Sequence, residues 1–284
     1  ILFTPFLNFA QVLSPQPSPS AVINQIIGLT DVKIEYSRPA MRGREIMGNL
    51  VPYGELWRTG ANANTKISFS DPVAIAGIVV PKGEYALYTR PGKQMWEVFF
   101  YKKSDNWALP KVWDANQIAV VSESKVSKTS ETIESFTIQI ENITNDKAEL
   151  TISWENSKVK TLIEVPTHQK TMTSIDKTLS GNPNASDYYR SAVYYLNREL
   201  DLKQAKNWME IAIEKGNDKY FHLRQYSLIL ASLGEKDAAI KIAKKSYELA
   251  EIAGNKDYLK MNTCDFKDKN VFVLPSSFGW SDLG

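Results

Sequence analysis

The chain has 284 residues, 43% of them hydrophobic, which is enough to bury one large core or two moderate ones and slightly favours two domains. Its 34 Lys and Arg balance 32 Asp and Glu, so no global field would draw the protein to nucleic acid or to an anionic membrane. The single cysteine, Cys264, excludes an intramolecular disulfide and Cys-based zinc sites, and His168 and His222 lack partners at metal-ligand spacing, so we expect neither metal nor cofactor.

The first twenty residues resemble the end of a secretory signal followed by a linker. The apolar run "ILFTPFLNFAQ" (1–11) ends in Ala10-Gln11 and precedes the Pro/Ser-rich "SPQPSPS" (14–20). A short core strand is the alternative interpretation. Residues 1–20 therefore predict an exported protein, located in the periplasm or on the cell surface. No later stretch has the roughly 18 apolar residues of a membrane span, so we expect none.

Between residues 31 and 165 the hydrophobic pattern has the period of two that is typical of β-strands. Gly, Asn and Asp at several junctions predict tight hairpins, so consecutive strands are expected to pair antiparallel. We predict an all-β antiparallel sandwich, or a barrel, over 21–166. The expected strands are 32–37, 65–70, 73–80, 84–89, 95–101, 118–126, 133–142, 147–156 and 158–165.

From about residue 169 the period becomes helical, and we predict a helical module over 167–262. Residues expected to face its core recur after 34 residues, the length of a tetratricopeptide repeat, although ordinary antiparallel helix pairs remain an alternative. Because two repeats rarely form a free-standing solenoid, we expect the module to contact the sandwich or a protein partner. The expected helices are 169–179, 186–198, 202–215, 219–233 and 236–253. The recurring residues are Ala205, Met209 and Ala212, then Ala239, Ala243 and Ser246.

A series of short motifs in order links 17–92 to a known family. The chain resembles the DUF2911 family, a domain of unknown function common in Bacteroidetes-type bacteria, over about 11–165. This resemblance implies an exported β-domain and supplies no established reaction. The motifs are "PSP" (17–19), "YSRP" (36–39), "RGR" (42–44), "GNLVPYG" (48–54), "WRTGAN" (57–62) and "GEYALY" (83–88).

Cationic, amide and aromatic residues concentrate in the same motifs. If the loops 38–54 and 57–64 converge, they form a pocket for a small anionic or sugar-like ligand, because guanidinium forks match carboxylate, phosphate or sulfate and aromatic faces stack on sugar rings. Alternatively, the arginines tie an irregular segment to backbone carbonyls and the asparagines cap turns. The candidate ligand-binding residues are Arg38, Arg42, Arg44, Tyr53, Trp57, Arg58, Asn62 and Asn64.

The candidate segment lacks a nucleophile paired with a base, so we assign no catalytic residue. A binding or interaction protein is therefore the leading hypothesis. An uncharacterised hydrolase that uses Glu45 or Glu55 in the same cleft is the alternative. The aromatic stretch "NWALPKVW" (106–113) is interpreted as an apolar loop tucked under the sandwich.

The last segment, 263–284, differs in pattern from the helices before it. Its end, "FGWSDLG" (278–284), resembles the end of a mannose-1-phosphate guanylyltransferase catalytic domain, a resemblance that places Asp282 near the sugar phosphate and its metal ion. The basic, glycine-rich phosphate loop that such an enzyme needs does not occur in 1–262. We interpret this tail as an artefact of fusion or assembly.

Overall fold

A computed structural model describes residues 14–268, which divide into two compact units between Lys170 and Thr171. Residues 1–13 of the predicted signal remnant lie outside the described residues. So do residues 269–284, which include the motif that resembles a guanylyltransferase.

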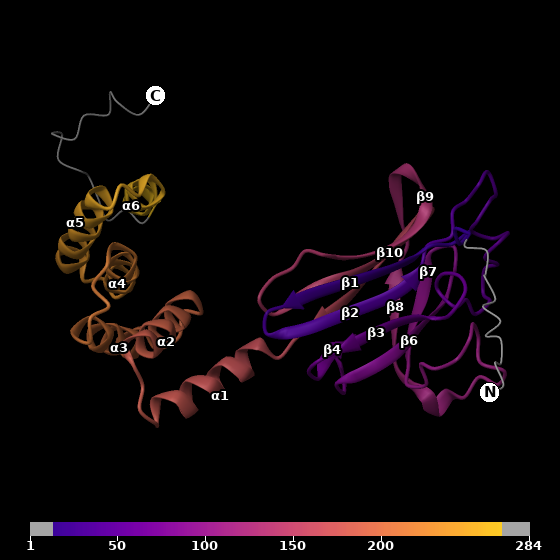
Figure 1. Ribbon diagram of the computed structural model, residues 1–284, viewed down its shortest axis with the longest axis horizontal. Coiled ribbons are helices and arrows are strands. Elements are labelled where there is room, and N and C mark those ends of the chain that lie inside the picture. Colours follow the sequence, from indigo (N-terminus) through magenta and orange to yellow (C-terminus); the bar gives the residue numbers. More distant parts are fainter. Residues whose placement is uncertain (1–13, 269–284) are drawn as a thin grey trace, which may run out of the picture. The chain divides into compact units, whose positions relative to one another are not determined.

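The first unit contains two antiparallel sheets and confirms the predicted all-β fold (Figure 1). Its strands range from three residues in β4 and β5 to 18 in β10, and four of the eight neighbouring pairs in the sheets are joined by hairpins. The six-stranded sheet consists of β1 (Ser20–Ile27), β2 (Thr30–Ser37), β3 (Thr65–Phe69), β6 (Gly83–Arg90), β7 (Met95–Tyr101) and β8 (Ile118–Lys125), in this order. The four-stranded sheet has the order β5 (Ile78–Val80), β4 (Val73–Ile75), β10 (Lys147–Glu164) and β9 (Ser127–Glu141).

The main core lies between the inner faces of the two sheets. Each fully buried aliphatic or aromatic side chain contributes roughly 1.5–3 kcal/mol to folding, so this shared core holds the sheets together. The inward residues alternate along each strand, as the period of two predicts. They include Val32, Ile34 and Tyr36 on β2 and Ala148, Leu150, Ile152 and Trp154 on β10.

A second, smaller cluster lies on the other face of β6 and β7. Tyr88, Phe99 and Tyr101 are buried there, and Trp113 from the connection to β8 packs against them. The side chains at the alternate positions of β6, Tyr85 and Leu87, belong to the main core. The connection between β7 and β8 therefore covers this face of the six-stranded sheet.

Two strand predictions differ from the structure. The segment predicted as one strand at 73–80 is a hairpin of β4 and β5, because Ala76 (φ 51°) and Gly77 (φ 75°) both adopt the left-handed conformation of a tight turn. The segments predicted at 147–156 and 158–165 are joined in β10, whose pairing with β9 shifts register around Glu155.

The structure adds one strand that the sequence analysis did not predict, β1. It is an edge strand, and its pairing with β2 runs from Ser20↔Ser37 to Ile27↔Thr30. Of its eight residues only Ile27 is fully buried, so β1 lacks the strong alternation that marked the other strands.

The second unit is helical, as predicted. Caps set several boundaries: Asn184 and Asp187 form a capping box at the start of α2, and Asp201 caps α3. Gly216 and Gly234 follow α3 and α4 with positive φ, the conformation that ends helices. The helices are α1 (Thr167–Leu179), which crosses the unit boundary, α2 (Ala185–Asn197), α3 (Leu202–Glu214), α4 (Tyr220–Ser232), α5 (Lys236–Ile252) and α6 (Lys256–Asp268).

The residues that recur after 34 positions are buried on both α3 and α5. Their burial explains the recurrence as core packing, and the tetratricopeptide resemblance stays a prediction. Helix α6 was not predicted from the sequence, and it includes residues 263–268 of the segment interpreted as a discordant tail. None of the helices within 14–268 combines the length and the apolar composition that a membrane crossing requires.

Candidate functional site

An open pocket of about 670 Å³ lies beside the irregular connection between β2 and β3. Both loops that were expected to converge, 38–54 and 57–64, contribute to its lining. Residues 17–18, which precede β1, residues 108–109, which follow β7, and Trp154 of β10 complete it. The pocket therefore gathers parts of the sandwich unit that are far apart in sequence.

The irregular connection is fixed by bonds to both sheets. Trp57 pairs with Thr89 of β6 through two backbone hydrogen bonds, with N to O distances of 2.7 and 2.9 Å. The carboxylate of Glu155 on β10 accepts the backbone N–H groups of Ile46 (3.2 Å) and Met47 (3.1 Å). These contacts hold the pocket walls in place without regular secondary structure.

Trp57 joins the pocket to the main core. Its ring stacks on Trp154 with centroids 5.8 Å apart, and meets Trp96 and Phe136 edge to face. Its Nε1 donates to the carbonyl of Gly60 at 3.2 Å. Trp57 is half-buried and also lines the pocket, so it serves both as a core residue and as part of the pocket surface.

Arg38 does not line the pocket. Its Nε donates to the carbonyl of Phe136 at 3.1 Å, and its Nη2 donates to Oγ1 of Thr137 at 2.9 Å. Arg38 therefore ties the start of the irregular connection to β9, as the alternative interpretation of the sequence proposed.

Arg42 and Arg44 line the pocket and also support its walls. Arg42 Nη2 donates to the carbonyl of Pro17 at 2.9 Å. Arg44 donates from Nε to Met41 O (2.8 Å) and from Nη2 to Ala40 O (2.7 Å). A guanidinium carries five N–H donors, so each side chain keeps donors that these carbonyls do not use.

Arg58 is a half-buried lining residue whose guanidinium forms no hydrogen bond within 14–268. In the same described range, no carboxylate forms an ion pair with Arg42, Arg44 or Arg58. The pocket lining thus holds three positive charges without an acidic partner from the described chain.

Three other predicted site residues lie away from the pocket lining. Tyr53 is exposed, and the centre of its ring lies 5.9 Å from Nζ of Lys93. Asn62 donates from Nδ2 to the carbonyl of Ser18 at 3.1 Å. Asn64 is buried and donates to the carbonyl of Ser104 at 3.1 Å, while its Oδ1 has no partner. Both amides therefore fix the connection instead of facing a ligand.

The sequence analysis missed Ala108 and Leu109, which form part of the pocket wall. They belong to the stretch that was expected to tuck under the sandwich. This expectation fits Trp113, whose ring stacks on Tyr101 with centroids 4.7 Å apart, but it does not fit Trp107, which is 73% exposed. The apolar character of the stretch was visible in the sequence. Its position beside the arginines was not.

The two carboxylates considered for hydrolysis, Glu45 and Glu55, are exposed and are not among the lining residues. Within residues 14–268 the structure also holds no cluster of His, Cys, Asp and Glu that could bind a metal ion. No described carboxylate is thus placed in the pocket as a base or nucleophile.

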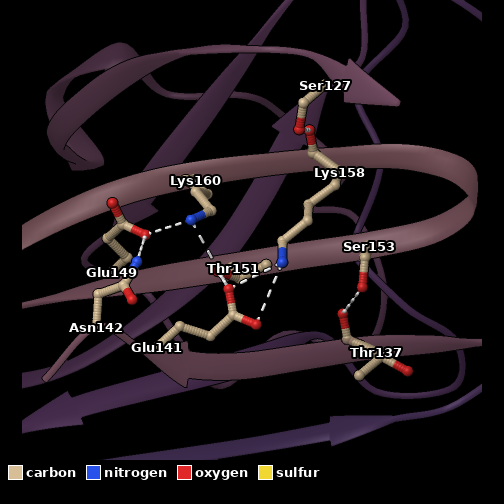
Figure 2. A network of polar contacts seen from close by, with 9 residues as sticks. All are labelled: Ser127, Thr137, Glu141, Asn142, Glu149, Thr151, Ser153, Lys158 and Lys160. Carbon is tan, nitrogen blue, oxygen red and sulfur yellow. Dashed lines mark hydrogen bonds and ion pairs between the residues drawn. The ribbon is translucent and has the colours of Figure 1, made fainter. Parts of the chain in front are cut away.

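A cluster of opposite charges on β9 and β10 provides a comparison with the pocket (Figure 2). Lys158 lies 2.9 Å from Oε2 of Glu141, and Lys160 lies 2.6 Å from Oε2 of Glu149. The hydrogen bond from Lys158 lowers the pKa of Glu141, and that from Lys160 lowers the pKa of Glu149. Here the fold pairs each cation with an acid, in contrast to the arginines of the pocket.

The comparisons with known proteins identify a family and nothing more specific. A family model described as "Protein of unknown function (DUF2911)" matches residues 18–163. This range includes the pocket arginines and every strand of the sandwich, apart from the last residue of β10. Searches of curated proteins and of solved structures give no match.

Proposed function

The chain belongs to the DUF2911 family, whose description names no activity, and we propose that its sandwich binds a small anionic ligand in the pocket lined by Arg42, Arg44 and Arg58. This ligand-binding role is the function that the geometry supports best.

The observation that carries the proposal is the set of unpaired guanidinium groups in one pocket. Positive charges gathered without an acidic partner repel one another, and an anion removes this cost while accepting their free N–H donors. Arg58 supports the proposal most directly, because no described residue accepts a hydrogen bond from it. The two lysines of the cluster on β9 and β10, by contrast, each have a glutamate as ion-pair partner.

No specific observation favours the hydrolase alternative, since Glu45 and Glu55 are outside the lining. The predicted export and a protein partner for the helical module rest on the sequence alone. Fractionation of expressing cells tests the export, and recovery of the protein solely in the cytosol contradicts it.

The test is calorimetric titration of the full chain with two anionic probes, hexanoate and phenyl phosphate. A charge-assisted hydrogen bond is worth about 1.5–3 kcal/mol, and 1.4 kcal/mol is tenfold in affinity. We therefore expect Arg58→Ala to weaken the binding of at least one probe about tenfold or more. Added salt should weaken the binding as well, because it screens the attraction.

The matched control is Arg190→Ala, which removes an exposed arginine from α2 and should leave the affinity unchanged. Unchanged melting of Arg58→Ala would show that the loss of binding does not come from unfolding. Equal affinity of Arg58→Ala and the unsubstituted chain would contradict the proposal, and so would the absence of binding by these two probes and by two sugar-derived anions, gluconate and glucose 6-phosphate.

A further inference from the structure

We infer that the ligand of this pocket is an amphiphilic anion, a molecule with one anionic group and an apolar or aromatic body, rather than a sugar acid or a sugar phosphate. The inference rests on the proposed function and specifies its ligand class. It follows from which hydrogen-bonding groups line the pocket, and from which of these are already in use.

The side chains of the lining donate hydrogen bonds and scarcely accept them. Its polar side chains are the three guanidiniums, the indoles of Trp57 and Trp154, and the hydroxyl of Ser18. Both indole N–H groups are already bound, to Gly60 O at 3.2 Å and to Glu134 O at 3.1 Å. No Asp, Glu, Asn or Gln is among these lining residues, all of which belong to the described chain.

Half of the backbone carbonyls of the lining are also in use, those of eight of its sixteen residues. The donors come from side chains and from neighbouring strands, and each of the following carbonyls already accepts at least one hydrogen bond. They belong to Pro17, Ser18, Pro39, Ala40, Val51, Trp57, Gly60 and Ala108.

A sugar needs many hydrogen-bond acceptors, and among the described lining residues only Ser18 has a side chain that can supply one. Each sugar hydroxyl both donates and accepts, and a buried hydroxyl whose proton has no acceptor loses its hydration without compensation. Asn62 and Asn64, two of the candidate ligand-binding residues, are not in the lining and donate to the carbonyls of Ser18 and Ser104. Glu134, whose carboxylate accepts the backbone N–H of Arg42 at 2.8 Å, is not a lining residue.

The rest of the lining suits an apolar body. Leu50 and Leu109 are 44% and 41% exposed although they line the pocket, and Val51 and Leu56 add further apolar side chains to the lining. An apolar group that covers such side chains removes their surface from water, which is favourable. The lining thus offers cations for a charged group and apolar surface for the remainder of the same molecule.

The experiment compares two pairs of probes that share the anionic group and differ in the body. Hexanoate and gluconate are carboxylates with the same carbon number, and phenyl phosphate and glucose 6-phosphate share a phosphate monoester. We expect the apolar member of each pair to bind about tenfold more tightly or better.

A substitution on the wall provides a second readout. Leu109→Asn adds an amide acceptor to the lining at a partly exposed loop position. It should weaken the binding of hexanoate and leave the binding of gluconate unchanged or make it tighter. The matched control is Val112→Asn in the same loop, where the side chain is 79% exposed and does not line the pocket. This control should change neither affinity.

The outcomes separate the two proposals. If gluconate or glucose 6-phosphate binds as tightly as its apolar counterpart, and Arg58→Ala weakens that binding, the anion-binding function stands and the amphiphilic ligand is overturned. If none of the four probes binds, both proposals fail.

Discussion

Trp57 illustrates, at the scale of one residue, how the pocket depends on the core. The indole is in contact with three other aromatic rings, those of Trp96, Phe136 and Trp154, and its backbone pairs with Thr89. Edge-to-face and stacked aromatic contacts add to the burial of a large apolar surface. A change at Trp57 therefore affects the stability of the sandwich as well as the shape of the pocket.

We predict that Trp57→Ala lowers the free energy of unfolding by about 3–5 kcal/mol, because it leaves a cavity among these rings. The control is Trp107→Ala, which removes a 73% exposed indole and should change stability by less than about 0.5 kcal/mol. Urea unfolding followed by circular dichroism measures both values. Similar losses for the two variants would show that the packing around Trp57 contributes little.

Arg38 and Arg58 show what a sequence can and cannot reveal about single residues. Both lie in motifs of the family, and the sequence left the same two alternatives for each, a ligand-binding role or a bond to backbone carbonyls. The partners that distinguish them, Phe136 and Thr137, lie about a hundred positions further along the chain. No local pattern predicts such a contact, so the sequence located the cationic segment but did not separate Arg38 from the arginines that line the pocket.

At the scale of elements, the sequence predicted well those strands that have one buried and one exposed face. It missed β1, in which only Ile27 is fully buried, and it merged β4 with β5, because Ala76 gives no sign of its left-handed turn conformation. It also missed the wall of the pocket at Leu109, which comes from a connection between strands. Connections lack a hydrophobic period, so their positions depend on tertiary contacts.

The charged cluster on β9 and β10 makes a prediction about pH (Figure 2). The pKa values of Glu141 and Glu149 are lowered in the folded chain, chiefly by hydrogen bonds from Lys158 and Lys160. A carboxylate whose pKa is lower in the folded than in the unfolded chain stabilises the fold when the pH is above the unfolded pKa. This stabilisation is lost as the pH falls through the folded pKa. The cluster should therefore stabilise the fold at neutral pH and lose this effect below the ordinary glutamate value of 4.5.

Glu141→Gln tests this prediction. It should destabilise the chain modestly near pH 7, by about 1 kcal/mol or less because the groups are partly exposed, and the difference should shrink towards about pH 3. Glu131→Gln is the control, since Glu131 is an exposed residue of the same strand without an ion pair within the described chain. A difference that stays constant over the pH range would show that the carboxylate charge of Glu141 does not stabilise the fold.

At the scale of the whole molecule, the chain consists of two units with separate cores. The sandwich has its own core between the two sheets, and the helical unit has another core around Ala205, Met209 and Ile229. The start of α1 belongs to the first unit, where Lys170 lies 2.7 Å from Asp71 and also donates to the carbonyl of Leu29. The sandwich is thus complete only with the first turn of the helix that follows it.

The carboxylate of Asp71 combines its ion pair to Lys170 with hydrogen bonds from Ser70 and Thr30. Burial alone would raise the pKa of Asp71, but the hydrogen bonds that it accepts from Lys170, Ser70 and Thr30 outweigh this effect and hold its pKa below the usual value. The carboxylate is therefore better stabilised in the folded unit than in the unfolded chain.

We predict that residues 14–179, produced without the remaining helices, fold cooperatively and bind the anionic probes as tightly as the full chain, because every described lining residue of the pocket lies in this segment. Within this fragment, Lys170→Met should lower the free energy of unfolding by about 1–2 kcal/mol by removing the bonds to Asp71 and Leu29. Thermal unfolding and calorimetric titration of both fragments provide the measurements. A fragment that folds but binds no probe, while the full chain does, would show that the helical unit takes part in the site.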